Sequence, residues 1–165
     1  MTFKDTLRIY LDRRMLWVFL MGCASGFPWV LIGSAMSGWL KDAGLTRTAI
    51  GLFGSIFAVY AINFLWAPLL DRVKLPGLSA LGQRRSWIVL AQALMLALTC
   101  LIATIDPAVS LLTTSLLALG IAVASATQDV AIDAFRIDHF SQAPKHYLPA
   151  ASAMAVIGWW TGYSL

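Results

Sequence analysis

Five long apolar runs divide this chain, and they constrain its fold more than any other feature. Each run is close to the roughly 20 residues that an α-helix needs to cross the hydrocarbon core of a bilayer. None of them alternates apolar and polar residues with the period of two that a membrane β-barrel requires. We therefore predict an all-α fold, a polytopic membrane helix bundle of about five transmembrane helices, over residues 15–40, 50–70, 87–105, 108–132 and 149–165.

The composition argues against a water-soluble domain. Hydrophobic residues make up 59% of the chain and charged residues only 12%, whereas a typical soluble domain carries about 25% charged residues. The net charge of +4 could suggest a nucleic-acid partner, but the basic residues lie between the apolar runs, so we expect membrane lipid and no nucleic acid. Cys23 and Cys100 both fall inside apolar runs, where they indicate packing and not a disulfide framework or a metal site.

The first run is too long for a signal peptide, and four more follow it.

The lysines and arginines predict the orientation. Ten of them lie in the N-terminal tail and in the connections 71–86 and 134–148, and two, Lys41 and Arg47, lie in the connection between the first two runs. Cytoplasmic segments carry the excess of basic residues in membrane proteins. We therefore expect a cytoplasmic N-terminus and cytoplasmic connections at 71–86 and 134–148.

The first run combines small residues with a proline. Gly22, Ser25 and Gly26 offer a face on which another helix can approach closely. Pro28 removes a backbone hydrogen bond within the membrane, so we expect a kink around Gly26 and Pro28. Such a break can lie near a moving part or a cavity, or it can be merely structural.

The fourth run ends in polar residues that could carry chemistry. Ser125, Asp129 and Asp133 are spaced by four residues and share one helical face, and Gln128 lies beside them. Ionisable residues in spans usually face a bundle interior or a water-filled path. Loss of hydration disfavours the charged carboxylate, which would let Asp129 load and release a proton. The alternative is that the span ends at Gln128 and both aspartates lie in the cytoplasmic interface.

A second group of charged residues lies on the 71–86 connection. Asp71 and Arg72 end the second run, and Arg84 and Arg85 precede the third. The simpler interpretation is a basic cytoplasmic loop. An acid and a base at a helix end also suit a conformational latch, because a carboxylate can pair with an arginine or cap a neighbouring helix.

No pattern in the sequence indicates a catalytic centre, a metal site or a cofactor. The connection that holds His139 and His146 is most simply solvated. A membrane enzyme that uses the face of Asp129 and Asp133 remains an alternative, because headgroup transferases also place aspartates at a cytoplasmic helix end. Those enzymes carry a further Asp-Gly and Ala-Arg pattern upstream, which this chain lacks.

These motifs resemble the major facilitator superfamily, and within it the AmpG-type muropeptide permeases. The pair Asp71-Arg72 with Gly82-Gln83-Arg84-Arg85 is similar to the loop between spans two and three of that superfamily, with Ala67 where glycine is usual. The stretches that resemble AmpG-type permeases are Gly22–Pro28, Phe64–Arg72, Arg84–Trp87 and Ser125–Ala134. The last is the most specific of the four, although acetyl-coenzyme A transporters carry something similar.

The resemblance implies a proton-driven importer of the bacterial inner membrane whose solute is an anhydromuropeptide, a sugar–peptide fragment of the cell wall. Two positions depart from the family pattern. Asn63 stands where lysine is usual, and Gly158-Trp159-Trp160 stands where Gly-Tyr-Arg is usual. Both changes remove a positive charge from a span. Either solute recognition has shifted from an anionic ligand toward stacking on Trp159 and Trp160, or the chain is a divergent paralogue. We therefore add Asn63, Trp159 and Trp160 to the residues expected along the solute path.

The resembled transporters have twelve spans in two halves, with the solute bound between them. This chain ends within the fifth run, so we expect part of an N-terminal half that works with the remaining helices. Two other interpretations stay open. The chain could be a five-span interaction or regulatory protein that does not transport, or it could be a membrane enzyme.

Overall fold

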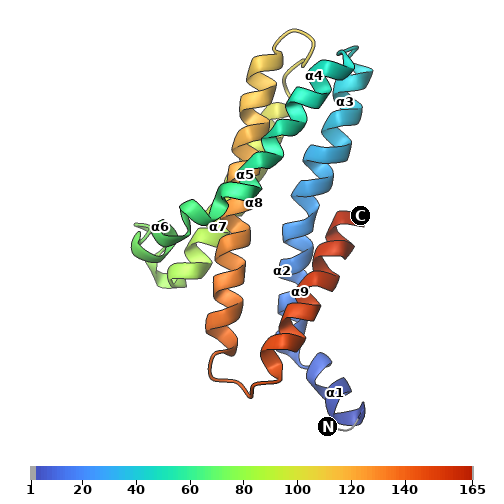
Figure 1. The fold of residues 1–165 in the computed structure, drawn as a ribbon. Helices are drawn as coiled ribbons and strands as arrows, with labels where there is room; N and C mark the ends of the chain where they lie inside the picture. The colour runs from blue at the N-terminus through green and yellow to red at the C-terminus, as the bar shows by residue number, and fades with distance from the viewer. Residues whose placement is uncertain (1–2, 165) are drawn as a thin grey trace. The chain divides into compact units, whose positions relative to one another are not determined.

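The computed structural model describes residues 3–164, and every regular element in that range is a helix, as the apolar runs predict. Figure 1 labels the α-helices in chain order. The α-helices are α1 (Phe3–Tyr10), α2 (Arg13–Val30), α3 (Met36–Asp42), α4 (Arg47–Phe53), α5 (Ala58–Ile62), α6 (Ala67–Arg72), α7 (Gln83–Ile102), α8 (Leu111–Phe140) and α9 (Tyr147–Ser164). The shorter helical segments are η1 (Leu31–Ala35), η2 (Gly54–Phe57), η3 (Asn63–Leu65) and η4 (Ser79–Leu81).

Within the described residues, four helical stretches are long and apolar enough to cross a membrane, namely Arg13–Asp42, Arg47–Leu65, Gln83–Ile102 and Leu111–Phe140. The fifth predicted span corresponds to α9, which is helical over Tyr147–Ser164 but is not among these four. The fourth stretch continues to Phe140, beyond the residue 132 expected from the sequence, so the first part of the 134–148 connection is helical. A short helix, α1, also replaces most of the tail that precedes the first span.

The first span is continuous but changes its winding after Pro28. Pro28 lies inside α2, and the π-helical segment η1 follows over Leu31–Ala35 before α3 resumes normal α geometry. Proline cannot donate a backbone hydrogen bond, and a wider π turn is one way in which a helix absorbs such a local loss. The irregularity therefore lies directly after the place where the sequence predicts a kink.

The second span is the least regular helix. The 3₁₀ segments η2 and η3 interrupt it, and it ends at Leu65, before the predicted residue 70. Trp66 separates η3 from α6, where Pro68 occupies the first turn. Proline disfavours the α conformation of the residue before it and is tolerated in the first turn of a new helix. Pro68 thus explains why Ala67–Arg72 forms a separate short helix.

The chain divides into two compact units, of which the first contains residues up to Val30 and from Ile132 onward. Its central feature is the packing of α2 against α9, which lie side by side as the blue and red helices of Figure 1. Around them, a small apolar core joins Met15 and Val18 of α2 to Ile9, Phe140 and Ala151.

The second unit covers Leu31–Ala131. Its apolar core is built from residues of η1, α3, the second span, α7 and α8. The buried members are Ile32, Met36, Leu40, Phe53, Ile56, Ile102, Ala118, Ile121 and Ala122. This core holds the second span against α8, and the polar residues of α8 follow directly after it.

Candidate solute and proton site

The polar end of α8 is the most deeply buried part of the predicted site. Ser125 and Gln128 are both 0% exposed. Asp129 is half-buried, and its Oδ1 atom has no access to solvent. All three lie on α8 within the second unit. The structure therefore brings Ser125, Gln128 and Asp129 into one buried polar cluster, as their spacing predicts.

Gln128 is the unusual member of this cluster. Neither its Oε1 nor its Nε2 atom has a hydrogen-bond partner among the described residues. A buried amide left without partners costs about 1–3 kcal/mol, and most buried polar side chains are satisfied. Gln128 therefore offers one donor group and one acceptor to a ligand, a water molecule or another polypeptide segment.

Tyr60, which the sequence analysis did not single out, belongs to the same cluster. It lies on α5, and its hydroxyl oxygen is buried near the Ser125 hydroxyl. An isolated tyrosine in an apolar run has no distinguishing sequence signal. Only the packing of α5 against α8 shows which side chain its hydroxyl meets.

A second polar contact ties the same two spans together. The indole Nε1 of Trp66 donates a hydrogen bond of 3.2 Å to Thr127 Oγ1. The Thr127 hydroxyl in turn donates to the Val123 carbonyl oxygen of its own helix at 2.7 Å. Trp66 stands at the break between η3 and α6, so this bond anchors the irregular end of the second span to α8.

Asn63 begins η3, and its carbonyl oxygen accepts a 3.3 Å hydrogen bond from the Trp66 backbone N–H. Its side chain is half-buried. The structure thus places Asn63 at the irregular end of the second span, in the same unit as Asp129.

Asp133 differs from Asp129. Its side chain is 63% exposed, and Oδ1 pairs with Arg136 one turn later at 3.0 Å. Asp133 lies in the first unit, whereas Asp129 lies in the second. Because of this exposure, Asp133 does not share the burial of Ser125 and Gln128.

Trp159 and Trp160 belong to an aromatic cluster in the first unit. Trp159 stacks on Tyr163 with ring centroids 5.4 Å apart and meets Trp29 edge-on at 5.7 Å. Trp160 packs edge-on against Trp159 and Tyr163 and remains 58% exposed. One face of Trp159 is therefore already covered by an aromatic ring, while Trp160 is more accessible.

Two residues of the predicted latch pair with each other in the second unit. Arg84 and Asp71 form an ion pair between the end of α6 and the start of α7. Beside it, Gln83 Nε2 donates to the carbonyl oxygens of Leu70 at 2.7 Å and Val73 at 2.5 Å. These bonds satisfy backbone groups at the C-terminus of α6 and hold the two helix ends together. Arg72 ends α6, and Arg85 lies in the first turn of α7.

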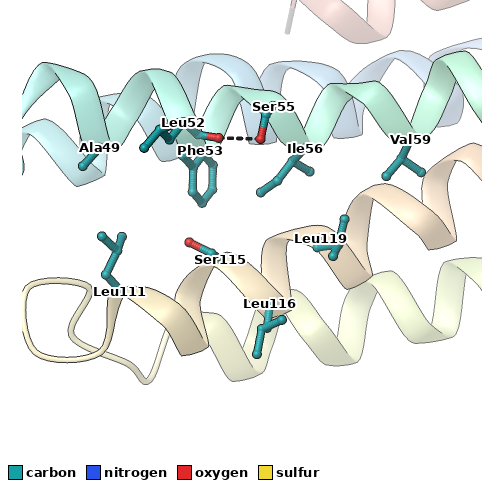
Figure 2. A pocket seen from close by; sticks show the side chains of 10 residues that line it. All are labelled: Ala49, Leu52, Phe53, Ser55, Ile56, Val59, Leu111, Ser115, Leu116 and Leu119. Atoms are coloured by element: carbon teal, nitrogen blue, oxygen red, sulfur yellow. Dashed lines mark hydrogen bonds between the residues drawn. The ribbon is translucent and has the colours of Figure 1, made fainter.

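A separate groove of about 370 Å³ lies between the second span and α8 (Figure 2). Its lining is apolar apart from Ser55 and Ser115, and the Ser55 hydroxyl donates to the Leu52 carbonyl oxygen at 2.6 Å. The predicted site residues do not line it. Within the described residues, no group of three or more His, Cys, Asp or Glu side chains could hold a metal ion.

Comparison with known proteins identifies the family. A family model described as acetyl-coenzyme A transporter 1 matches residues 15–165. The chain belongs to this transporter family. Its AmpG-type members include "Putative transporter AmpG 4" of Rickettsia felis, 37% identical over 155 residues, which cover 94% of this chain and 37% of the relative. The anhydromuropeptide permease of Escherichia coli K12 is 31% identical over 156 residues, which cover 94% of this chain and 30% of the permease.

The chain thus spans about a third of the length of these relatives. Membership of the AmpG and acetyl-coenzyme A transporter family, within the major facilitator superfamily, confirms the resemblance seen in the sequence. It also confirms that the chain is a multi-pass membrane protein of a transporter family and not an enzyme.

Proposed function

We propose that this chain forms part of the N-terminal helices of a proton-coupled importer in the bacterial inner membrane, with its N-terminus in the cytoplasm. The proposed solute is an anhydromuropeptide or a related sugar–peptide. The orientation rests on the ten basic residues assigned to the cytoplasmic side against two on the other. The choice of solute is based on the Escherichia coli relative, which is named anhydromuropeptide permease.

The observation that carries the proposal is the buried polar cluster of Ser125, Gln128 and Asp129 on α8. Polar and ionisable groups are expensive inside a membrane and usually mark a solute or ion pathway. The amide of Gln128 matches the donors and acceptors of a peptide or an N-acetyl group. Asp129 provides a carboxyl that can carry a proton between the two sides.

Transporters of this superfamily bind their solutes between two halves, so we propose that the chain works together with further helices. Asp71 and Arg84 would then act as a latch that closes the cytoplasmic side, with Arg72 and Arg85 as neighbouring basic residues. Trp159 and Trp160 would stack on the sugar rings of the solute, and Asn63 would face the path where the family usually carries lysine.

The test uses Escherichia coli cells that lack their own anhydromuropeptide permease. One strain expresses this chain alone, and a second expresses a chimera in which the chain replaces the matching 156 residues of the permease. We expect the chimera to take up labelled anhydromuropeptide. Membrane insertion without uptake would contradict the proposed solute, and acetyl-coenzyme A, which the family description names, is the next solute to assay.

Proton coupling is tested in proteoliposomes that contain the purified chimera, with and without Asp129→Asn. We expect solute to drive proton uptake in the parent chimera and not in the variant. Unchanged coupling in Asp129→Asn would remove this carboxyl from the mechanism. Uptake by the chain alone would show that it needs no further helices. A chain that inserts but transports neither alone nor in the chimera would favour the non-transporting alternative.

A further inference from the structure

The short helix α1, directly before the first span, presents an exposed apolar face. Leu7, Tyr10 and Leu11 stand at i, i+3 and i+4, positions that share one face of a helix, and their side chains are 48%, 36% and 75% exposed. Leu11 extends α1 by one residue, because its backbone N–H donates to the Leu7 carbonyl oxygen at 3.0 Å. These three side chains form the apolar face of α1.

The opposite side of α1 is docked on the first unit. Ile9 is only 6% exposed and belongs to the apolar core that contains Met15 of α2 and Phe140 at the end of α8. Successive residues of a helix are rotated by about 100°, so a helix that buries Ile9 turns Leu7 and Leu11 the other way. The docking of Ile9 therefore fixes the apolar face of α1 on the outside of this unit.

A tight turn separates α1 from the first span. The chain turns at Leu11 and Asp12, and α2 begins at Arg13. The Arg14 backbone N–H donates to Asp12 Oδ1 at 2.9 Å, and the Met15 backbone N–H donates to the Asp12 carbonyl oxygen at 2.8 Å. A carboxylate that accepts in this way caps the start of a new helix. The apolar face of α1 consequently lies at the end of the span and is not part of it.

The residues around this turn are those that favour the surface of a membrane. Trp17, one turn into α2, is 54% exposed, and tryptophan is enriched where the hydrocarbon core meets the lipid headgroups. Arg8, Arg13 and Arg14, the arginine cluster, are exposed, and among the described residues no acidic side chain forms an ion pair with them. Exposed basic residues beside an exposed apolar face match a surface of anionic phospholipids in both charge and polarity.

We propose that α1 is an in-plane membrane anchor: its apolar face enters the acyl region of the adjoining leaflet, and the arginine cluster binds anionic phospholipid headgroups. A helix of eight residues is too short to be stable alone in water. The turn to α2 overcomes this limit, because it keeps α1 at the membrane surface as soon as the span inserts. The inference requires insertion of the first span, and it does not depend on the proposed solute, proton coupling or orientation.

Spin labels on the 165-residue chain in lipid vesicles test the anchor. Single labels are attached at Leu7→Cys and Leu11→Cys, in a chain whose two cysteines are removed by Cys23→Ser and Cys100→Ser. Power saturation then compares collisions with oxygen, which concentrates in the bilayer, and with the water-soluble complex Ni(EDDA). A label at Gln142→Cys is the matched control, because Gln142 is exposed in the connection that follows α8 in the same unit.

We expect the labels at Leu7 and Leu11 to collide with Ni(EDDA) several-fold less often than the label at Gln142, and more often with oxygen. Labels at Leu7 and Leu11 that are as open to Ni(EDDA) as the control would overturn the inference. Labels shielded from both reagents would overturn it too, because protein and not lipid would then cover the apolar face of α1. The two positions are independent, so one of them decides the matter if the other variant does not insert.

Lipid composition tests the arginine cluster. Phosphatidylglycerol added to phosphatidylcholine vesicles should raise the ratio of oxygen to Ni(EDDA) collisions at Leu11, and high salt should reverse this change by screening the charges. Arg8→Gln combined with Arg13→Gln should abolish the response. The matched control, Lys41→Gln combined with Arg47→Gln, removes two basic residues beyond the other end of the first span and should retain it. A ratio that ignores phosphatidylglycerol, or that responds equally in both double variants, would overturn the inference.

Discussion

Helices α2 and α9 approach each other closely at their glycines, and adding a single methyl group there tests this packing. A Cβ atom placed on Gly26 would lie 2.1 Å from the Trp159 carbonyl oxygen and 2.9 Å from the Tyr163 backbone nitrogen. On the opposite helix, a Cβ atom on Gly162 would lie 2.1 Å from the Cys23 carbonyl oxygen. Both glycines therefore face backbone atoms, and backbone atoms cannot rotate out of the way.

The cost of Gly26→Ala follows from this geometry. Real Cβ atoms essentially never approach a neighbour closer than 3.0 Å, so the helices must separate by at least 0.9 Å, which is 3.0 minus 2.1. A separation of that size also loosens the contacts made by Gly22 and Gly158 along the same seam. Overpacking a well-packed site typically costs about 1–3 kcal/mol. We expect a loss in that range, offset in part by the better helix propensity of alanine.

Reversible unfolding in mixed micelles, followed by tryptophan fluorescence and circular dichroism, measures this loss. Gly38→Ala is the matched control, because a Cβ atom there would have no neighbour within 4 Å. This control should keep or slightly raise the free energy of unfolding. If Gly26→Ala proves as stable as the parent chain, the tight packing of α2 on α9 is wrong.

Three further predictions concern polar side chains, each checked by the same unfolding assay. Gln128→Leu should raise the free energy of unfolding by about 1–3 kcal/mol, because it removes a buried amide without partners. The same substitution should lower uptake by the chimera. A destabilised variant would show that the amide is satisfied in the folded chain. Trp66→Phe should lower that free energy by about 0.5–1.5 kcal/mol through loss of the hydrogen bond to Thr127, and an unchanged value would refute this bond. Asp133→Asn should cost only about 0.2–0.5 kcal/mol, because Asp133 itself is exposed and its pair with Arg136 lies within one helix. A loss of several kcal/mol would place Asp133 in a buried site.

The helices themselves could be predicted from the sequence alone. A run of about 20 apolar residues in a bilayer must satisfy its backbone hydrogen bonds internally, which leaves the helix as the solution for a single segment. The ends were less predictable, because they depend on local chemistry. Pro68 shortens the second span, and α8 continues to Phe140 through the charged residues Asp133, Arg136 and Asp138, where the apolar run has already ended.

The candidate site, like the helices, was predictable from the sequence only in part. The spacing of Ser125 and Asp129 placed them on one helical face, and the structure buries that face. Asp133 has the same spacing from Asp129, but it lies exposed in an ion pair with Arg136. Periodicity describes the faces of one helix, and burial depends on how far the neighbouring helices extend along each face.

The amino-acid sequence by itself determined the membrane helices, the small-residue face of the first span and the polar end of the fourth span. Only the tertiary structure decided what those faces meet. It placed Gly22 against Gly158 and Gly26 against the backbone of Trp159 and Tyr163. The physical reason is that backbone hydrogen bonding is satisfied within each helix, whereas a partner is selected by contacts between segments far apart in the sequence.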